Sequence, residues 1–113
     1  MATGKYTVDH FRSEQGREPV RKYVDSLPKE EKGAIFAAFL DMAKDGWDGL
    51  TEVRWIAPKL WEIKVYQHRI FYTVFAREIV LLHAYKKQSG KAPVTEIDTA
   101  KARLATETKN RGG

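Results

Sequence analysis

The hydrophobic side chains of the N-terminal part follow first a strand pattern and then a helical one. Residues 5–11 alternate β-branched and aromatic side chains with polar ones, which predicts a strand. After Pro19, hydrophobic residues recur at positions i, i+3, i+4 and i+7; they are Val20, Tyr23, Val24 and Leu27. This spacing predicts a short helix with one apolar face.

Pro28 ends this helix and begins a second, longer one, because proline fits the first helical turn. Glu30 and Glu31 lie in that first turn, where carboxylates complement the helix dipole. Lys44 lies in the last turn, and Gly46 suits a left-handed C-terminal cap. The predicted apolar face consists of Ile35, Phe36, Phe39, Leu40 and Met42.

From residue 51 the pattern changes to a period of two. It predicts strands over 51–57, 60–66, 69–76 and 79–85, with a tight turn at Gln67-His68. The last of these strands begins with an apolar run that does not alternate, which predicts a central strand covered on both faces.

Pro93 begins a final helix that carries Val94, Ile97 and Leu104 on one side, and residues 106–113 resemble a polar tail. The element order predicts one domain over residues 1–113, with an ordered core over about 5–105. The expected fold class is α+β: an antiparallel sheet of four or five strands, two N-terminal helices packed on it and one C-terminal helix.

The composition excludes several classes of function. The chain has 113 residues and no cysteine, so disulfides and thiolate chemistry are ruled out. No apolar run reaches the roughly 18 residues that a membrane span needs, and no signal peptide pattern opens the chain. We therefore expect a cytoplasmic protein. The three histidines are scattered and no glycine-rich phosphate loop is present, so neither a metal nor a cofactor is predicted.

Positive charge is concentrated in the second half of the chain. Residues 54–91 hold eight Lys or Arg side chains against Glu62 and Glu78 alone, whereas residues 1–53 hold eight against ten carboxylates. This asymmetry favours a surface that faces a polyanion. The alternative interpretation is an ordinary solvated sheet face.

A hairpin between two of the predicted strands would place Lys64 beside Arg69. Two like charges held together are unfavourable unless an anion joins them. Lys and Arg side chains that can contact phosphate, together with aromatic side chains on which bases can stack, are typical of RNA binding. The candidate RNA-binding residues are Lys59, Tyr66, Lys86 and Lys91, while Tyr85 and His83 share a neighbouring strand face. The plainer interpretation of these tyrosines is packing at the edge of the core.

An ordered series of short segments resembles the HigB branch of the RelE-like toxins of bacterial and phage toxin–antitoxin systems. The resemblance covers roughly residues 6–105. The segments are Ser26-Leu27-Pro28, Leu60-Trp61-Glu62-Ile63-Lys64, Arg69-Ile70-Phe71-Tyr72, Leu81-Leu82-His83-Ala84-Tyr85-Lys86-Lys87, Lys91-Ala92-Pro93, Glu96-Ile97, Ala100 and Arg103.

The resemblance implies a ribonuclease that cuts messenger RNA on the ribosome without a metal, and a neighbouring helix-turn-helix antitoxin (HigA-like) as its partner. The nucleotide 2′-hydroxyl would attack the adjacent phosphate. Lys64, Arg69 and Lys87 would bind the phosphate and its transition state, and Tyr85 and His83 would serve in stacking or proton transfer.

The chain departs from the family pattern at three positions. Lys64 stands where many members have Arg, Tyr85 where many have Phe, and Gln88 where a second lysine is usual. Two alternatives to an enzyme stay open: a non-catalytic module that binds RNA or acts as an antitoxin-binding co-repressor, and a surface without any nucleic acid partner.

Overall fold

The computed structural model describes residues 5–45, 52–88 and 93–112. Gly46 and Lys91, for which the sequence predicts a helix cap and an RNA contact, lie outside these ranges. The elements in chain order are β1 (Thr7–His10), α1 (Pro19–Asp25), α2 (Lys29–Asp45), β2 (Glu52–Ala57), β3 (Leu60–Val65), β4 (His68–Phe75), β5 (Glu78–Lys86) and α3 (Val94–Asn110).

The five strands form one sheet in the order β1-β5-β4-β3-β2. The predicted α+β fold is confirmed, and β2 to β5 form the predicted antiparallel meander. The sheet is nevertheless mixed, because β1 pairs in parallel with β5, from Thr7 opposite Glu78 to His10 opposite Leu81. β5 is therefore internal to the sheet, as its continuous apolar run predicts.

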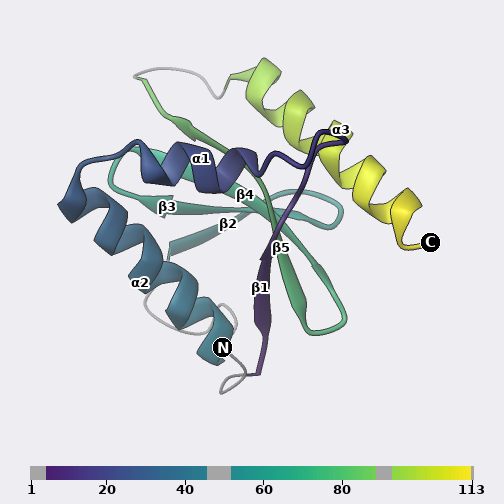
Figure 1. The fold of residues 1–113 in the computed structure, drawn as a ribbon, viewed down its shortest axis with the longest axis horizontal. Helices are drawn as coiled ribbons and strands as arrows, with labels where there is room; N and C mark the ends of the chain where they lie inside the picture. Colours follow the sequence, from purple (N-terminus) through teal and green to yellow (C-terminus); the bar gives the residue numbers. More distant parts are fainter. Residues whose placement is uncertain (1–4, 46–51, 89–92, 113) are drawn as a thin grey trace.

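The helices cover both faces of the sheet. In Figure 1, α1 crosses in front of the strands with α2 beside it, and α3 runs along another side of the sheet. The α1/α2 face buries Val20, Val24, Ile35, Phe39, Met42, Ile63, Ile70, Tyr72, Ile79, Leu81 and Ala84. The α3 face buries Phe11, Leu60, Phe71, Val80, Leu82, Tyr85 and Ala100. Each helix is thus held by its apolar stripe.

The turn between β3 and β4 lies one residue before the predicted position. Tyr66 and Gln67 form it, and Tyr66 adopts a φ of 54°. Left-handed backbone costs a residue with a Cβ roughly 1–2 kcal/mol, so Gly or Asn is the usual signal there. Because the sequence lacks that signal, the turn could not be placed accurately from residue types.

His68 consequently begins β4 and is a buried residue, 1% exposed, on the α1/α2 side. Its Nε2 lies 2.5 Å from a carboxylate oxygen of Glu31 on α2, and its Nδ1 lies 2.6 Å from the hydroxyl of Tyr23 on α1. This side chain joins both N-terminal helices to the sheet.

A β-bulge interrupts the pairing of β4 with β5. Phe71 lies opposite His83 and Tyr72 opposite Leu81, so Leu82 is the extra residue. A bulge turns the side chains that follow it. Leu82 packs in the α3-side cluster, and His83 stacks on Phe71 of that same cluster. The bulge thus fixes where His83 points.

α3 extends to Asn110, whereas the sequence predicts a polar tail from residue 106. Just beyond the helix, Arg111 Nη1 lies 2.9 Å from a Glu78 carboxylate oxygen, and the guanidinium lies 4.5 Å from the centre of the Phe75 ring. These contacts hold the last turns against the β4–β5 hairpin. No described helix is both long enough and apolar enough to cross a bilayer.

Candidate RNA-binding and catalytic site

Four cationic side chains surround one small cavity at an end of the sheet. It has a volume of about 160 Å³ and is lined by Glu52, Val53, Arg54, Glu62, Lys64, Arg69 and Lys87. We call it the cation cavity. It brings together three predicted phosphate-binding residues, Lys64, Arg69 and Lys87, and adds Arg54.

The strand register explains why these cations meet. Lys64 lies directly opposite Arg69 in the β3–β4 hairpin, so the predicted closeness of these two cations is confirmed. Arg69 in turn lies opposite Tyr85, and Lys87 is two residues further along, where its backbone N–H donates to the Gln67 carbonyl over 2.7 Å. Side chains two residues apart in an extended chain face the same side.

Two carboxylates lie among the cations. Arg54 Nη2 is 3.4 Å from a carboxylate oxygen of Glu62, whose side chain is only 5% exposed, and Lys64 Nζ is 3.9 Å from Glu52. Four cations against two carboxylates leave a net positive cavity. The buried carboxylate of Glu62 is therefore held in place by an electrostatic environment that also attracts an anion.

Tyr85 is packed, not free to stack on a base. It is 7% exposed, and its ring stacks on those of Phe71 and His83, with centroids 5.7 Å and 6.3 Å away. Burial, followed by the charge of Glu62, raises the pKa of its phenol, while Arg69 and Arg54 oppose that shift. The phenol is therefore protonated at neutral pH and lies within the field of the cation cavity.

Both ring nitrogens of His83 are occupied. Arg103 Nη1 lies 3.0 Å from Nδ1, and Nε2 lies 2.5 Å from a carboxylate oxygen of Glu96. A guanidinium only donates hydrogen bonds, so Nδ1 accepts and Nε2 carries the proton that it donates to Glu96. The ring of His83 is thus held in one orientation, and α3 supplies both of its partners.

The remaining predicted RNA-binding residues lie elsewhere. Lys59 occupies the β2–β3 turn, just before the start of β3, whereas Lys64 lies near the other end of that strand. Lys59 lines a different cavity with Arg77 and Arg111. Tyr66 is 60% exposed, and with Lys86 it lines a cavity beside Glu30 and Glu31 of α2. Lys86 lies opposite the inward-facing His68, on the other side of the sheet from Lys87. The structure does not bring these three residues together with the cation cavity.

Sequence reasoning missed Arg54 and Glu62 as members of the site. The available signal was their alternation, because Arg54 pairs with Glu62 on the strand face that also carries Lys64. It also missed Glu96 and Arg103 as partners of His83, which no local pattern could reveal. Within the described residues, no three His, Asp or Glu side chains are grouped as a metal site requires.

Comparison with known proteins places the chain in a family. A profile described as phage derived protein Gp49-like matches residues 22–105. This span is well over half of the chain, which therefore belongs to the Gp49-like family.

The fold has a solved counterpart. One chain of the crystal structure of the archaeal RelE–RelB complex from Pyrococcus horikoshii OT3 superposes with a TM-score of 0.57 at 16% sequence identity. The match covers 76% of this chain and 99% of that one, so the fold is RelE-like. No curated protein sequence matches the chain.

Proposed function

We propose that this protein is the toxin of a type II toxin–antitoxin system, of the HigB branch, and that it is an endoribonuclease that cleaves messenger RNA on the ribosome. The observation that carries the proposal is the cation cavity: Arg54, Lys64, Arg69 and Lys87 converge around the buried carboxylate of Glu62. Its support is the sequence resemblance, membership of the Gp49-like family and the RelE-like fold.

The proposed reaction uses the RNA's own 2′-hydroxyl as nucleophile, so it needs no metal-bound water. Glu62 accepts the hydroxyl proton as the oxygen bonds to phosphorus, and the bond from phosphorus to the 5′-oxygen breaks. Lys64, Arg69 and Lys87 neutralise the charge that grows on the phosphoryl oxygens. The leaving 5′-oxygen takes a proton from Tyr85 or a lysine, and the products are a 2′,3′-cyclic phosphate and a 5′-hydroxyl.

His83 has a supporting role in this proposal. Its nitrogens are bound to Glu96 and Arg103, so it reaches the reaction only through the ring of Tyr85, on which it stacks. We therefore regard it as a positioning residue for Tyr85.

The proposed protein partner is a helix-turn-helix antitoxin. A cavity between α2 and the β2–β3 edge is lined by Ala34, Ala37, Ala38, Asp41, Glu52, Lys64 and Val65. Leu40, also on α2, is 58% exposed. An amphipathic antitoxin segment in this groove would bury apolar surface and also reach Lys64, which lines both cavities. Antitoxin binding would then compete with RNA.

Expression of the chain in bacteria tests the proposal. Growth should stop with the wild-type chain and continue with Lys64→Ala, Arg69→Ala or Lys87→Ala. Lys101→Gln removes one exposed positive charge from α3, away from the cation cavity, and should remain toxic. Folded alanine variants that stay fully toxic would remove the cation cavity from the mechanism.

One observation favours the alternative of a non-catalytic RNA-binding or co-repressor module. Glu62 is paired with Arg54, and both nitrogens of His83 are occupied, so a proton acceptor must first be released from a partner. In that case RNA affinity falls steeply with salt but the RNA stays intact. Incubation with translated message, followed by mapping of 5′ ends, separates the two functions.

A further inference from the structure

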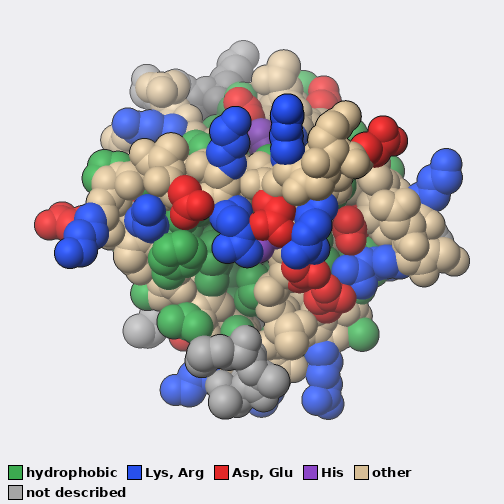
Figure 2. All heavy atoms as spheres, in the orientation of Figure 1, with side chains coloured by type: hydrophobic (Ala, Val, Ile, Leu, Met, Phe, Trp, Pro, Cys, Tyr) green, Lys and Arg blue, Asp and Glu red, His purple; other side chains and the backbone are tan. Residues whose placement is uncertain are grey.

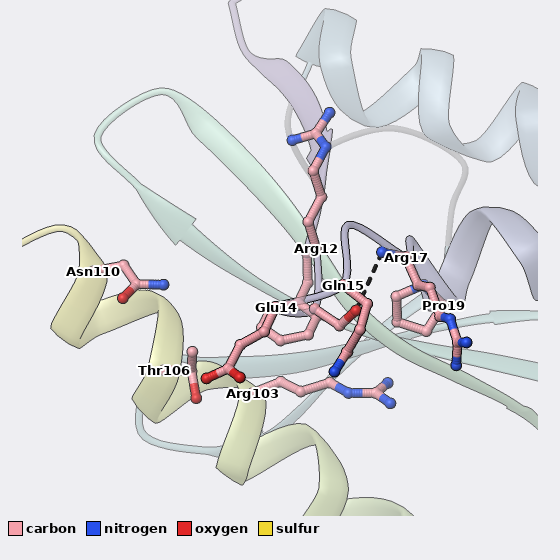
Figure 3. A pocket seen from close by; sticks show the side chains of 10 residues that line it. Arg12, Glu14, Gln15, Arg17, Pro19, Arg103, Thr106 and Asn110 are labelled. Carbon is pink, nitrogen blue, oxygen red and sulfur yellow. Dashed lines mark hydrogen bonds between the residues drawn. The ribbon is translucent and has the colours of Figure 1, made fainter.

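A second, larger cavity lies between the segment that follows β1 and the helix α3 (Figure 3). Its volume is about 640 Å³, within the range of ligand pockets. The lining residues are Phe11, Arg12, Ser13, Glu14, Gln15, Arg17, Pro19, Arg103, Thr106 and Asn110. We call it the arginine cavity, because three of its residues are arginines and only Glu14 is acidic.

Arg103 is a partly buried cation without a counterion. No carboxylate of the described residues lies within 4.0 Å of its guanidinium, which instead donates from Nη1 to the Leu82 carbonyl over 3.0 Å and to His83. Phe11 lies below it, with 5.5 Å between the ring centre and Cζ. Burial lowers the pKa of Arg103, because it removes water from the guanidinium. An anion in the cavity would supply the missing charge.

Arg17 is a second cation for which the described chain offers no carboxylate within 4.0 Å. Figure 3 shows its guanidinium and the amide of Gln15 on the same side as the guanidinium of Arg103. Arg12 points away from them in that view, and its Nε lies 2.7 Å from Glu18. On the face drawn in Figure 2, basic and acidic side chains are intermingled. Arg17 and Arg103 thus bring to the cavity two guanidinium charges that no carboxylate of the described residues pairs with.

The donors determine the class of ligand. Planar guanidinium groups, with amide and hydroxyl groups beside them, match the oxygens of a phosphate. The aromatic ring in the cavity, Phe11, is buried and covered by Arg103, so it offers no face on which a base could stack. A ligand would thus be held through its charged oxygens and not through a nucleobase.

We propose that the arginine cavity is a second phosphate-binding site, in which Arg17 and Arg103 hold a phosphodiester of the RNA strand at a distance from the bond that is cut. That the phosphate comes from RNA rests on the proposed function. Arg103 also holds His83, whose ring stacks on Tyr85 at the cation cavity. The RNA strand would therefore be anchored by the same side of α3 that positions His83 and Tyr85 at the cation cavity.

The test uses the full chain labelled with ¹⁵N and two probes, inorganic phosphate and a short single-stranded RNA with 2′-O-methyl groups that cannot be cleaved. Both probes should shift the backbone amide signals of Ser13, Arg17 and Thr106. In Arg17→Gln these shifts should weaken several-fold, whereas Lys101→Gln removes a charge from α3 outside the cavity and should keep them. Because the RNA is not cleavable, loss of the proposed ribonuclease activity would leave this readout unchanged.

Salt dependence supplies the second measurement. Each phosphate contact to single-stranded RNA contributes about 0.7 to the slope of log affinity against log salt. The slope for Arg17→Gln should be smaller than that for the wild type by about 0.7, and that for Lys101→Gln should be unchanged. Shifts with phosphate but not with RNA would overturn the assignment to RNA, and shifts with neither probe would overturn the site itself.

Discussion

His68 links three elements through two partly buried hydrogen bonds, and its replacement by Phe tests that link. The ring volume is nearly preserved, but Tyr23 on α1 and Glu31 on α2 lose their partner. The packing of both helices on the sheet is then held by apolar contacts alone, directly beside Arg69.

The magnitude follows from the two contacts. A neutral hydrogen bond contributes about 1 kcal/mol and one to a charged group about 1.5–3 kcal/mol. Glu31 is partly exposed, so its carboxylate regains water in the variant, which reduces the stability lost with its hydrogen bond. The Phe ring also adds some apolar burial. We therefore expect a loss of about 2 kcal/mol in the free energy of unfolding, which corresponds to a fall of roughly 8 °C in Tm for a domain of this size.

Urea unfolding of a double-mutant cycle measures the effect. Tyr23→Phe together with His68→Phe should cost less than the sum of the single changes, because removing both partners leaves no unpaired hydroxyl. Tyr66→Phe removes the hydroxyl of an exposed tyrosine and should change stability by less than about 0.5 kcal/mol. The reasoning is refuted if His68→Phe is as stable as the wild type.

Two further predictions concern pH and rate. Burial lowers the pKa of His10 below its usual 6.5, so the unfolded chain binds the proton more readily. The contribution of neutral His10 to the free energy of unfolding is complete above about pH 6.5 and is lost as the pH falls through the folded-state pKa. In urea titrations between pH 7.5 and 5, the free energy of unfolding of His10→Gln should therefore change less with pH than that of the wild type. Equal pH dependence in the two proteins would contradict this prediction. Glu62→Gln should slow RNA cleavage by about 10²–10⁴-fold without weakening RNA binding, since it removes the proposed base and a negative charge together; a rate within a few-fold of wild type would exclude that role.

The sequence predicted what depends on neighbours along the chain. Helical spacing located α1 and α2, and the hairpin predicted from strand alternation brings Lys64 close to Arg69. These features follow from the spacing of side chains, which repeats every 3.6 residues in a helix and every two in a strand. That spacing is visible within one element, without its partners in the fold.

Features that depend on distant partners were not predictable in the same way. The parallel pairing of β1 with β5 joins segments about 70 residues apart, and the bulge at Leu82 has no residue signal. The partners of His83 come from α3, so the closed environment of this residue appears only when the helix is docked. Lys86 and Lys87 look equivalent in sequence, but strand alternation sends their side chains to opposite faces.

Cleavage of a translated message in a purified translation reaction tests the central claim most directly. Primer extension should show cuts inside codons with the wild-type chain and with Lys101→Gln, and the upstream fragments should end in a 2′,3′-cyclic phosphate. Arg69→Gln removes one charge from the cation cavity and should leave the message intact. Full-length message with the wild-type chain, or equal cutting by Arg69→Gln, would contradict a phosphate-binding cavity that cleaves RNA.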